Sequence, residues 1–298
     1  RNGLRTLRQA ATHFRDYEEA PDVTQQMTEA FDSLYLDDVA DELSPVTAIA
    51  LYDEFKELTP PGEKGDEMIR KLADRLVDVD LLDRATRLLQ GQVEFRLEGL
   101  EKSRVGTQLA LIHIIALEYD EAIGALDGSE GEGLPEELIQ QRRHLRARAL
   151  IGLYSNEEAL ALLDKDKSID AELLRTEIFW GDKDWVQAGQ TLRRLIRLLG
   201  ARPDQPVNDL VGRHILNLAI AETLARDERG IDRLMRDYGV AMEQGPFRDA
   251  FQLIASPETL GLISYRSIAG KVADVENFQS FMAAYQERLK ERKLSAIN

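Results

Sequence analysis

Hydrophobic residues recur three and four positions apart along most of the chain, and prolines stand between these segments rather than inside them. Apolar residues at that spacing share one face of an α-helix, so the pattern predicts amphipathic helices joined by polar connections. Ser44 followed by Pro45 predicts a helix over residues 45–58, because serine supplies a capping oxygen and proline suits the first helical position. Residues 128–133 and 201–207 are predicted loops, and no segment shows the sustained alternation of a strand.

One longer pattern recurs: an apolar helix, a tight polar turn, and a second helix that opens with an acidic residue and an alanine. Copies cover residues 72–89, 109–126, 147–163 and 174–192. The alanines that open the second helices, Ala85, Ala122, Ala159 and Ala188, lie 37, 37 and 29 residues apart. Spacings of this size indicate stacked helical repeats. A degenerate fifth copy covers residues 211–238, with Gly230 or Ile231 at the equivalent position.

These residues resemble the tetratricopeptide repeat family, in which small side chains stand where two antiparallel helices touch. Ala73, Ala110 and Ala147 take that position on the first helices, and the four alanines above take it on the second. The chain departs from the family at Arg146 and Arg175, where a large apolar residue is usual, and at Thr176, where a small one is usual.

The resemblance implies an all-α fold: a right-handed α-solenoid of antiparallel helix pairs with atypical capping helices at both ends. It divides the chain into an N-terminal helical cap or degenerate repeats (residues 1–60), repeats (61–240) and C-terminal capping helices (241–298). Residues 52–62 and 245–251 also look like segments of long proteobacterial members of the family. We therefore expect a bacterial protein, from the cytoplasm or the periplasm, and a longer parent chain.

The function implied by the resemblance is a non-enzymatic scaffold that binds a peptide or a partner protein through its concave face. Projecting the repeat pattern onto that face gives the candidate partner-binding residues Arg70, Asp74, His144, Arg148, Glu177 and Trp180. Two alternatives stay open. The chain is an architectural or self-assembly component of a larger bacterial complex, or it is a regulatory domain of a longer chain.

Composition narrows the possible partners. The chain has 54 acidic residues against 38 Lys and Arg, for a net charge of −16. Such a surface repels phosphates, so a general nucleic-acid binder is excluded. The longest strongly apolar stretch, residues 109–117, is far short of the roughly 20 residues that span a bilayer, so no membrane insertion is expected. Cysteine is absent, which excludes disulfides and thiolate sites.

No metal, cofactor or catalytic residue is predicted. The four histidines are never three or four positions apart, as a helical metal pair requires. Residues 164–170 imitate a calcium loop, but Ile169 and Arg175 stand where that loop needs glycine and a bidentate glutamate. The sequence contains no nucleophile-elbow, kinase or zincin motif.

Arginines form two clusters, and each cluster has two interpretations. The first contains Arg142, Arg143, Arg146 and Arg148, and the second contains Arg193, Arg194 and Arg197. Guanidinium groups bind carboxylates bidentately, so either cluster could grip an acidic peptide. Pairing with acidic residues of the chain itself is the favoured interpretation, because the surface is strongly acidic.

Overall fold

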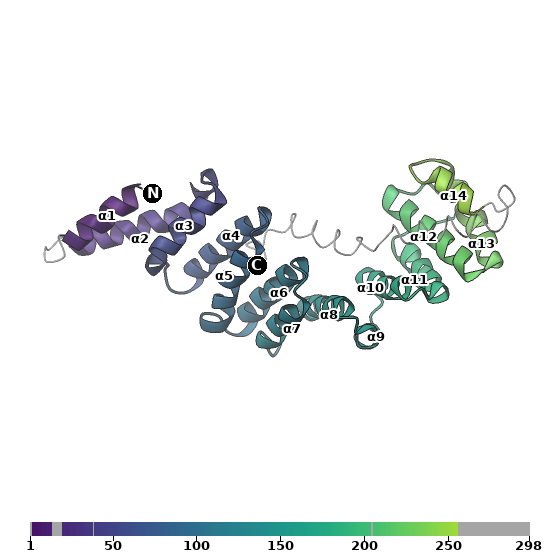
Figure 1. Cartoon of the computed structure of the whole chain (residues 1–298), viewed down its shortest axis with the longest axis horizontal. Helices are drawn as coiled ribbons and strands as arrows, with labels where there is room; N and C mark the ends of the chain where they lie inside the picture. The colour runs from purple at the N-terminus through teal and green to yellow at the C-terminus, as the bar shows by residue number, and fades with distance from the viewer. Residues whose placement is uncertain (1, 14–19, 38, 204, 256–298) are drawn as a thin grey trace. The chain divides into compact units, whose positions relative to one another are not determined.

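The computed structural model describes residues 2–13, 20–37, 39–203 and 205–255, and every regular element in these ranges is helical (Figure 1). The described chain forms two compact units, residues 2–149 and 150–255. The boundary lies in the last turn of helix α8 (Glu136–Gly152), inside the segment predicted to hold the repeats. The predicted division at residues 60 and 240 stays a prediction, and residues 256–298 of the predicted C-terminal capping helices lie outside the described residues.

Unit 1 contains α1 (Asn2–His13), α2 (Ala20–Leu36), α3 (Pro45–Phe55), α4 (Glu63–Asp78), α5 (Leu82–Phe95), α6 (Gly99–Ile115), α7 (Tyr119–Gly128) and most of α8 (Glu136–Gly152), with short 3-10 helices at Val39–Glu42 and Lys56–Leu58. Unit 2 contains α9 (Asn156–Leu163), α10 (Ile169–Gly181), α11 (Trp185–Leu198), α12 (Asp209–Ala225), α13 (Glu228–Tyr238), the 3-10 helix Ala241–Glu243 and α14 (Arg248–Ala255).

The helix predicted over residues 45–58 is confirmed as α3 and the 3-10 helix that follows it. The Ser44 hydroxyl accepts a hydrogen bond from the Thr47 N–H at 3.3 Å, and Pro45 begins the helix. Local capping chemistry therefore sets this boundary, as the sequence predicted. The two predicted loops also lie between helices, after α7 and after α11.

One turn geometry closes the first helix of five consecutive pairs in the described chain: α4–α5, α6–α7, α8–α9, α10–α11 and α12–α13. Each turn contains one residue with φ close to +60°; these are Asp80, Leu117, Tyr154, Lys183 and Arg226. The N–H of the next residue donates to the carbonyl five positions earlier, at 2.8 to 2.9 Å in all five turns. This is the Schellman arrangement, which satisfies the last carbonyls of a helix.

The turns establish a common register for the five pairs. Each predicted alanine of a second helix lies five positions after the left-handed residue, and all four are fully buried. In the fifth pair the same count from Arg226 leads to Ile231, which is 9% exposed. Ile231 rather than Gly230 therefore occupies the equivalent position.

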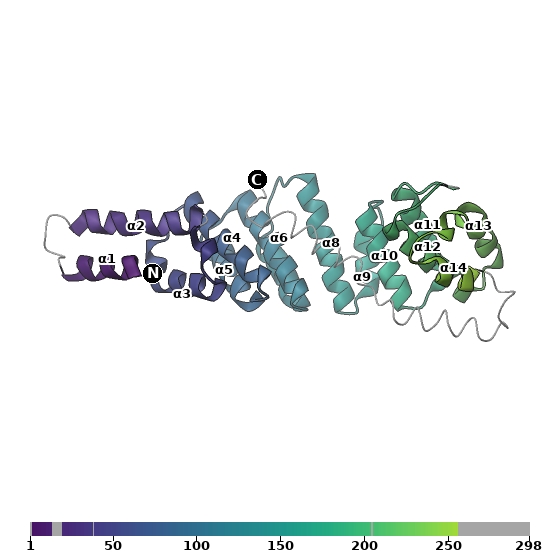
Figure 2. The same cartoon turned by 90° about the horizontal axis from the view of Figure 1, so that it is seen from above.

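Neighbouring helices pack in chain order within each unit. In unit 1, α4, α5, α6 and α7 each contact the next, and Figure 2 shows α4, α5 and α6 side by side. In unit 2, α9 to α13 do the same, and α14 packs on α12. Ala73 and Ala110 are fully buried, and a Cβ on Gly106 would lie 1.9 Å from Ser129 Oγ. Small residues therefore permit the close approach of these helices.

Leu117→Gly is expected to stabilise unit 1. Leu117 has φ of 63° and is 70% exposed, so it holds a left-handed conformation without a packing gain. The left-handed region costs an L-residue about 1–2 kcal/mol, and glycine gives back about 0.5–1 kcal/mol through its unfolded-state freedom. The net gain of about 0.5–1 kcal/mol is measured as a higher urea midpoint. Leu117→Ala keeps a Cβ and should give no gain, and equal shifts for the two variants would contradict this account.

Candidate functional site

Two of the predicted face residues lie on α4 of unit 1. Arg70 and Asp74 are one helical turn apart, and both are half-buried. The Arg70 guanidinium lies 4.0 Å from the Glu101 carboxylate of α6, at the limit of an ion pair. Arg70 is therefore partly neutralised inside the unit, and its side chain is 16% exposed.

Two further face residues lie one turn apart on α8. His144 is buried at 4% exposure, whereas Arg148 is half-buried. The Arg148 guanidinium carbon lies 5.9 Å from the centroid of the Tyr119 ring, within the range of a cation–π contact. Of this pair, Arg148 offers the more accessible charged group.

The last two predicted face residues, Glu177 and Trp180, lie on α10 of unit 2. Glu177 is half-buried and Trp180 is 6% exposed. The Trp180 ring packs edge-on against Trp185, with 5.3 Å between ring centroids and an interplanar angle of 88°. This contact joins the end of α10 to the start of α11, and it leaves little indole surface for a partner. Unit 1 thus holds four of the six predicted residues and unit 2 holds two.

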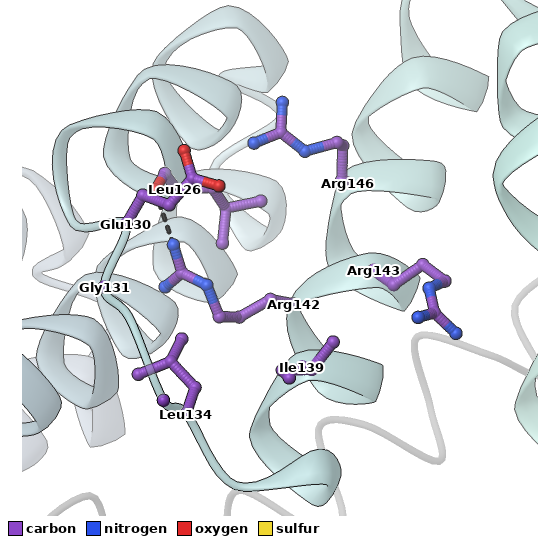
Figure 3. Close-up of a pocket in the computed structure, with 9 residues that line it drawn as sticks. Leu126, Glu130, Gly131, Leu134, Ile139, Arg142, Arg143 and Arg146 are labelled. Atoms are coloured by element: carbon purple, nitrogen blue, oxygen red, sulfur yellow. Dashed lines mark hydrogen bonds between the residues drawn. The ribbon is translucent and has the colours of Figure 1, made fainter.

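The first arginine cluster lines a cavity of about 370 Å³ in unit 1 (Figure 3). The cavity lies between the end of α7, the loop that follows it and α8. Its charged lining residues are Glu130, Arg142, Arg143 and Arg146, and its apolar ones are Leu126, Leu134 and Ile139. Figure 3 shows Arg142 reaching from α8 toward the end of α7, while Arg143 points the other way.

Arg142 is committed to contacts inside unit 1. Its Nη1 donates to the Ser103 carbonyl at 2.9 Å, to Thr107 Oγ1 at 2.9 Å and to Ser129 Oγ at 3.2 Å. Its Nη2 donates to the Leu126 carbonyl at 2.5 Å. One guanidinium therefore joins α6, the end of α7 and α8, with the planar fork that distinguishes arginine from lysine.

The electrostatics of the cavity follow from this burial. Desolvation, together with the neighbouring Arg146 charge, lowers the pKa of the Arg142 guanidinium from its usual value. Arg146 itself forms an ion pair with Asp127. The cavity wall is therefore built largely from arginines that already have acceptors in the chain.

The second arginine cluster is paired in the same way. Arg193 donates to the buried Glu222 carboxylate, with its Nε at 2.8 Å, and the Arg194 Nε lies 3.0 Å from both Glu172 oxygens. Burial raises the pKa of Glu222, and the Arg193 charge opposes that rise. Intramolecular pairing, the favoured interpretation of the clusters, is confirmed for Arg146, Arg193 and Arg194.

Arg142 and Arg175 share a role that the sequence pattern did not reveal. Arg142 donates to the Leu126 carbonyl of α7, and Arg175 donates to the Leu163 carbonyl of α9. Both carbonyls lie nine positions after the left-handed residue of their pair. Each carbonyl lies at a helix C-terminus and accepts one backbone N–H, from Ser129 or Asp166, and the arginine adds a second, charged donor. We call Arg142 and Arg175 the capping arginines. The feature of the sequence that could have indicated this role is Arg175 itself, which stands where the family usually has a large apolar residue.

No protein-family model, curated protein or solved structure matches the chain. Among the described residues, no three His, Asp or Glu side chains are grouped as a metal ion would require. Over the same residues, no helix is both long enough and apolar enough to span a bilayer.

Proposed function

We propose that the chain is a non-enzymatic interaction scaffold, a right-handed, tetratricopeptide-like solenoid that binds a peptide or partner protein along its concave face. The observation that supports this proposal is the common register of the five helix pairs, each closed by the same turn. In repeat proteins of this kind the core lies between neighbouring pairs, and equivalent positions on successive first helices form an extended binding surface.

The proposed face carries both signs of charge. In unit 1, Arg70 and Arg148 provide half-buried cations and Asp74 a half-buried carboxylate. A partner with both acidic and basic residues fits such a face better than a partner with charges of one sign, because unpaired charges at an interface cost binding energy. Partly buried charges also lose less of their interaction energy to solvent.

The test is affinity for peptides selected from a random display library with the purified chain. We expect Arg148→Gln to weaken a selected peptide about tenfold, equivalent to ~1.4 kcal/mol, because a half-buried cation in contact with a partner is poorly screened. Isothermal titration calorimetry measures the change.

Arg229→Gln is the matched control, because Arg229 is exposed on α13 and the charge change is the same. Equal affinity in the Arg148 and Arg229 variants would show that the peptide does not bind at this face. If no peptide is enriched and the mass of the chain in light scattering rises with concentration, self-assembly replaces the scaffold proposal.

A further inference from the structure

A second cavity, of about 490 Å³, lies in unit 2. Its walls come from the loop between α9 and α10, from the first turns of α10 and from the C-terminal end of α11. None of the predicted face residues lines it. Its volume falls within the range of about 300–1,000 Å³ that is typical of small-molecule sites.

The base of this cavity is held by a buried carboxylate. Glu172 is 4% exposed and accepts from Arg175 Nη1 at 2.9 Å and from Arg194 Nε at 3.0 Å. The other terminal nitrogen of Arg175 donates to the Leu163 carbonyl and, at 2.5 Å, to the Asp166 carbonyl. These contacts fix α10, α11 and the loop together, so the cavity is formed before any ligand arrives.

Three cations around the cavity keep donors unused. Arg194 contributes only its Nε to Glu172, and its terminal nitrogens make no hydrogen bond with the described residues. Lys167 and Arg197 are exposed lining residues, and within the described ranges neither forms an ion pair. The lining holds four cations, Arg175 included, against three carboxylates, so it is slightly positive in a chain of net charge −16.

We propose that this cavity binds a small oxyanionic ligand, with a carboxylate or phosphate group held by Lys167, Arg194 and Arg197. Planar guanidinium groups hydrogen-bond carboxylate and phosphate oxygens in pairs, and the lysine adds a point charge. The site is separate from the scaffold face, and it functions whether or not that face binds a peptide.

The surroundings limit the ligand to a small one. Asp164 and Asp166 also line the cavity, so an extended polyanion would meet repulsion beyond the three cations. Leu198 lines the same cavity and is 46% exposed, which offers an apolar contact for the rest of the ligand. The structure thus favours a ligand in which one anionic group is attached to a short apolar or polar chain.

Calorimetric titration of the full chain at low ionic strength tests the site, with citrate and inorganic phosphate as separate probes. We expect saturable one-to-one binding of at least one probe, and the stronger probe shows whether carboxylate or phosphate is preferred. Arg197→Gln and Lys167→Gln should each weaken binding about tenfold or more, because each removes a cation that contacts the anion. Arg229→Gln carries the same charge change outside the cavity and should leave the affinity unchanged.

The proposal is overturned if neither probe gives a saturable signal, or if Arg197→Gln and Arg229→Gln weaken binding equally. Binding of a glutamate-rich hexapeptide without binding of citrate or phosphate would also overturn it, because the site would then recognise a peptide. Circular dichroism of each variant shows that the helices are intact. A failed peptide selection leaves this result unaffected, so the two proposals fail separately.

Discussion

Arg142→Met should lower the free energy of unfolding of unit 1 by about 3 kcal/mol, because hydrogen bonds to a charged group contribute about 1.5–3 kcal/mol each. The methionine replaces the aliphatic stem of the side chain but removes all four donations of Arg142. Two of its acceptors, the Ser129 hydroxyl and the Leu126 carbonyl, keep a bond to each other at 3.3 Å, so the loss is smaller than the full sum. The loss should appear as faster amide hydrogen exchange at the ends of α6 and α7.

Arg84→Met is the matched control for this prediction. Arg84 is exposed on α5 in the same unit, and its side chain makes no hydrogen bond or ion pair with the described residues. Its replacement should change stability by less than about 0.5 kcal/mol, as for most surface substitutions. Arg142→Lys should fall between the two, since an ammonium group cannot reproduce the planar fork. Similar exchange rates in the Arg142→Met and Arg84→Met proteins would show that the capping role contributes little.

The helix pairs were predictable from the sequence because their determinants are local. An alanine that faces a neighbouring helix recurs at the same place in each pair, and the turn before it is short and polar. Ala85, Ala122, Ala159 and Ala188 are all fully buried, as expected of residues that face a neighbouring helix. The handedness of the solenoid and the family membership stay predictions, because neither follows from these local contacts.

The left-handed residues were less predictable. Glycine is the usual residue at such a position, yet the five turns contain no glycine there, and Leu117 and Tyr154 give no sequence signal for φ near +60°. The backbone hydrogen bonds of the turn impose the left-handed conformation on whichever residue stands at that position. For the same reason the sequence did not decide whether Gly230 or Ile231 is equivalent to the alanines. The equivalent position is found only by counting from the left-handed residue of the turn.

The candidate site was predictable only in part. Pairing of the arginines with the chain's own acids followed from the charge balance, but their partners did not, because the contacts join residues far apart in sequence. Arg142 and the Ser103 carbonyl are separated by 39 positions, and Arg194 and Glu172 by 22. The burial of Trp180 against Trp185 depends on ring orientation, which periodicity does not define.

Lowering the pH from 7 to 5 should destabilise unit 2 through His214. This histidine is 4% exposed on α12, and burial, helped by the Arg213 charge, lowers its pKa to about 4 from its ordinary value of 6.5. Between these values the unfolded chain binds a proton that the folded chain does not. The free energy of unfolding therefore falls as the pH falls through this window, by about 3 kcal/mol in total and about 2 kcal/mol of that between pH 7 and 5.

Urea unfolding of wild type and His214→Gln at both pH values isolates this contribution. The buried Glu222 has a raised pKa and acts in the opposite direction, since an acid that is harder to ionise in the folded state favours folding at lower pH. Both proteins contain Glu222, so the difference between their pH slopes belongs to His214. His13→Gln, which replaces an exposed histidine of α1, is measured beside it as a second histidine substitution. If the His214 variant keeps the wild-type slope, the imidazole of His214 is protonated equally in the folded and unfolded states, and α12 holds it in a more polar environment than its burial indicates.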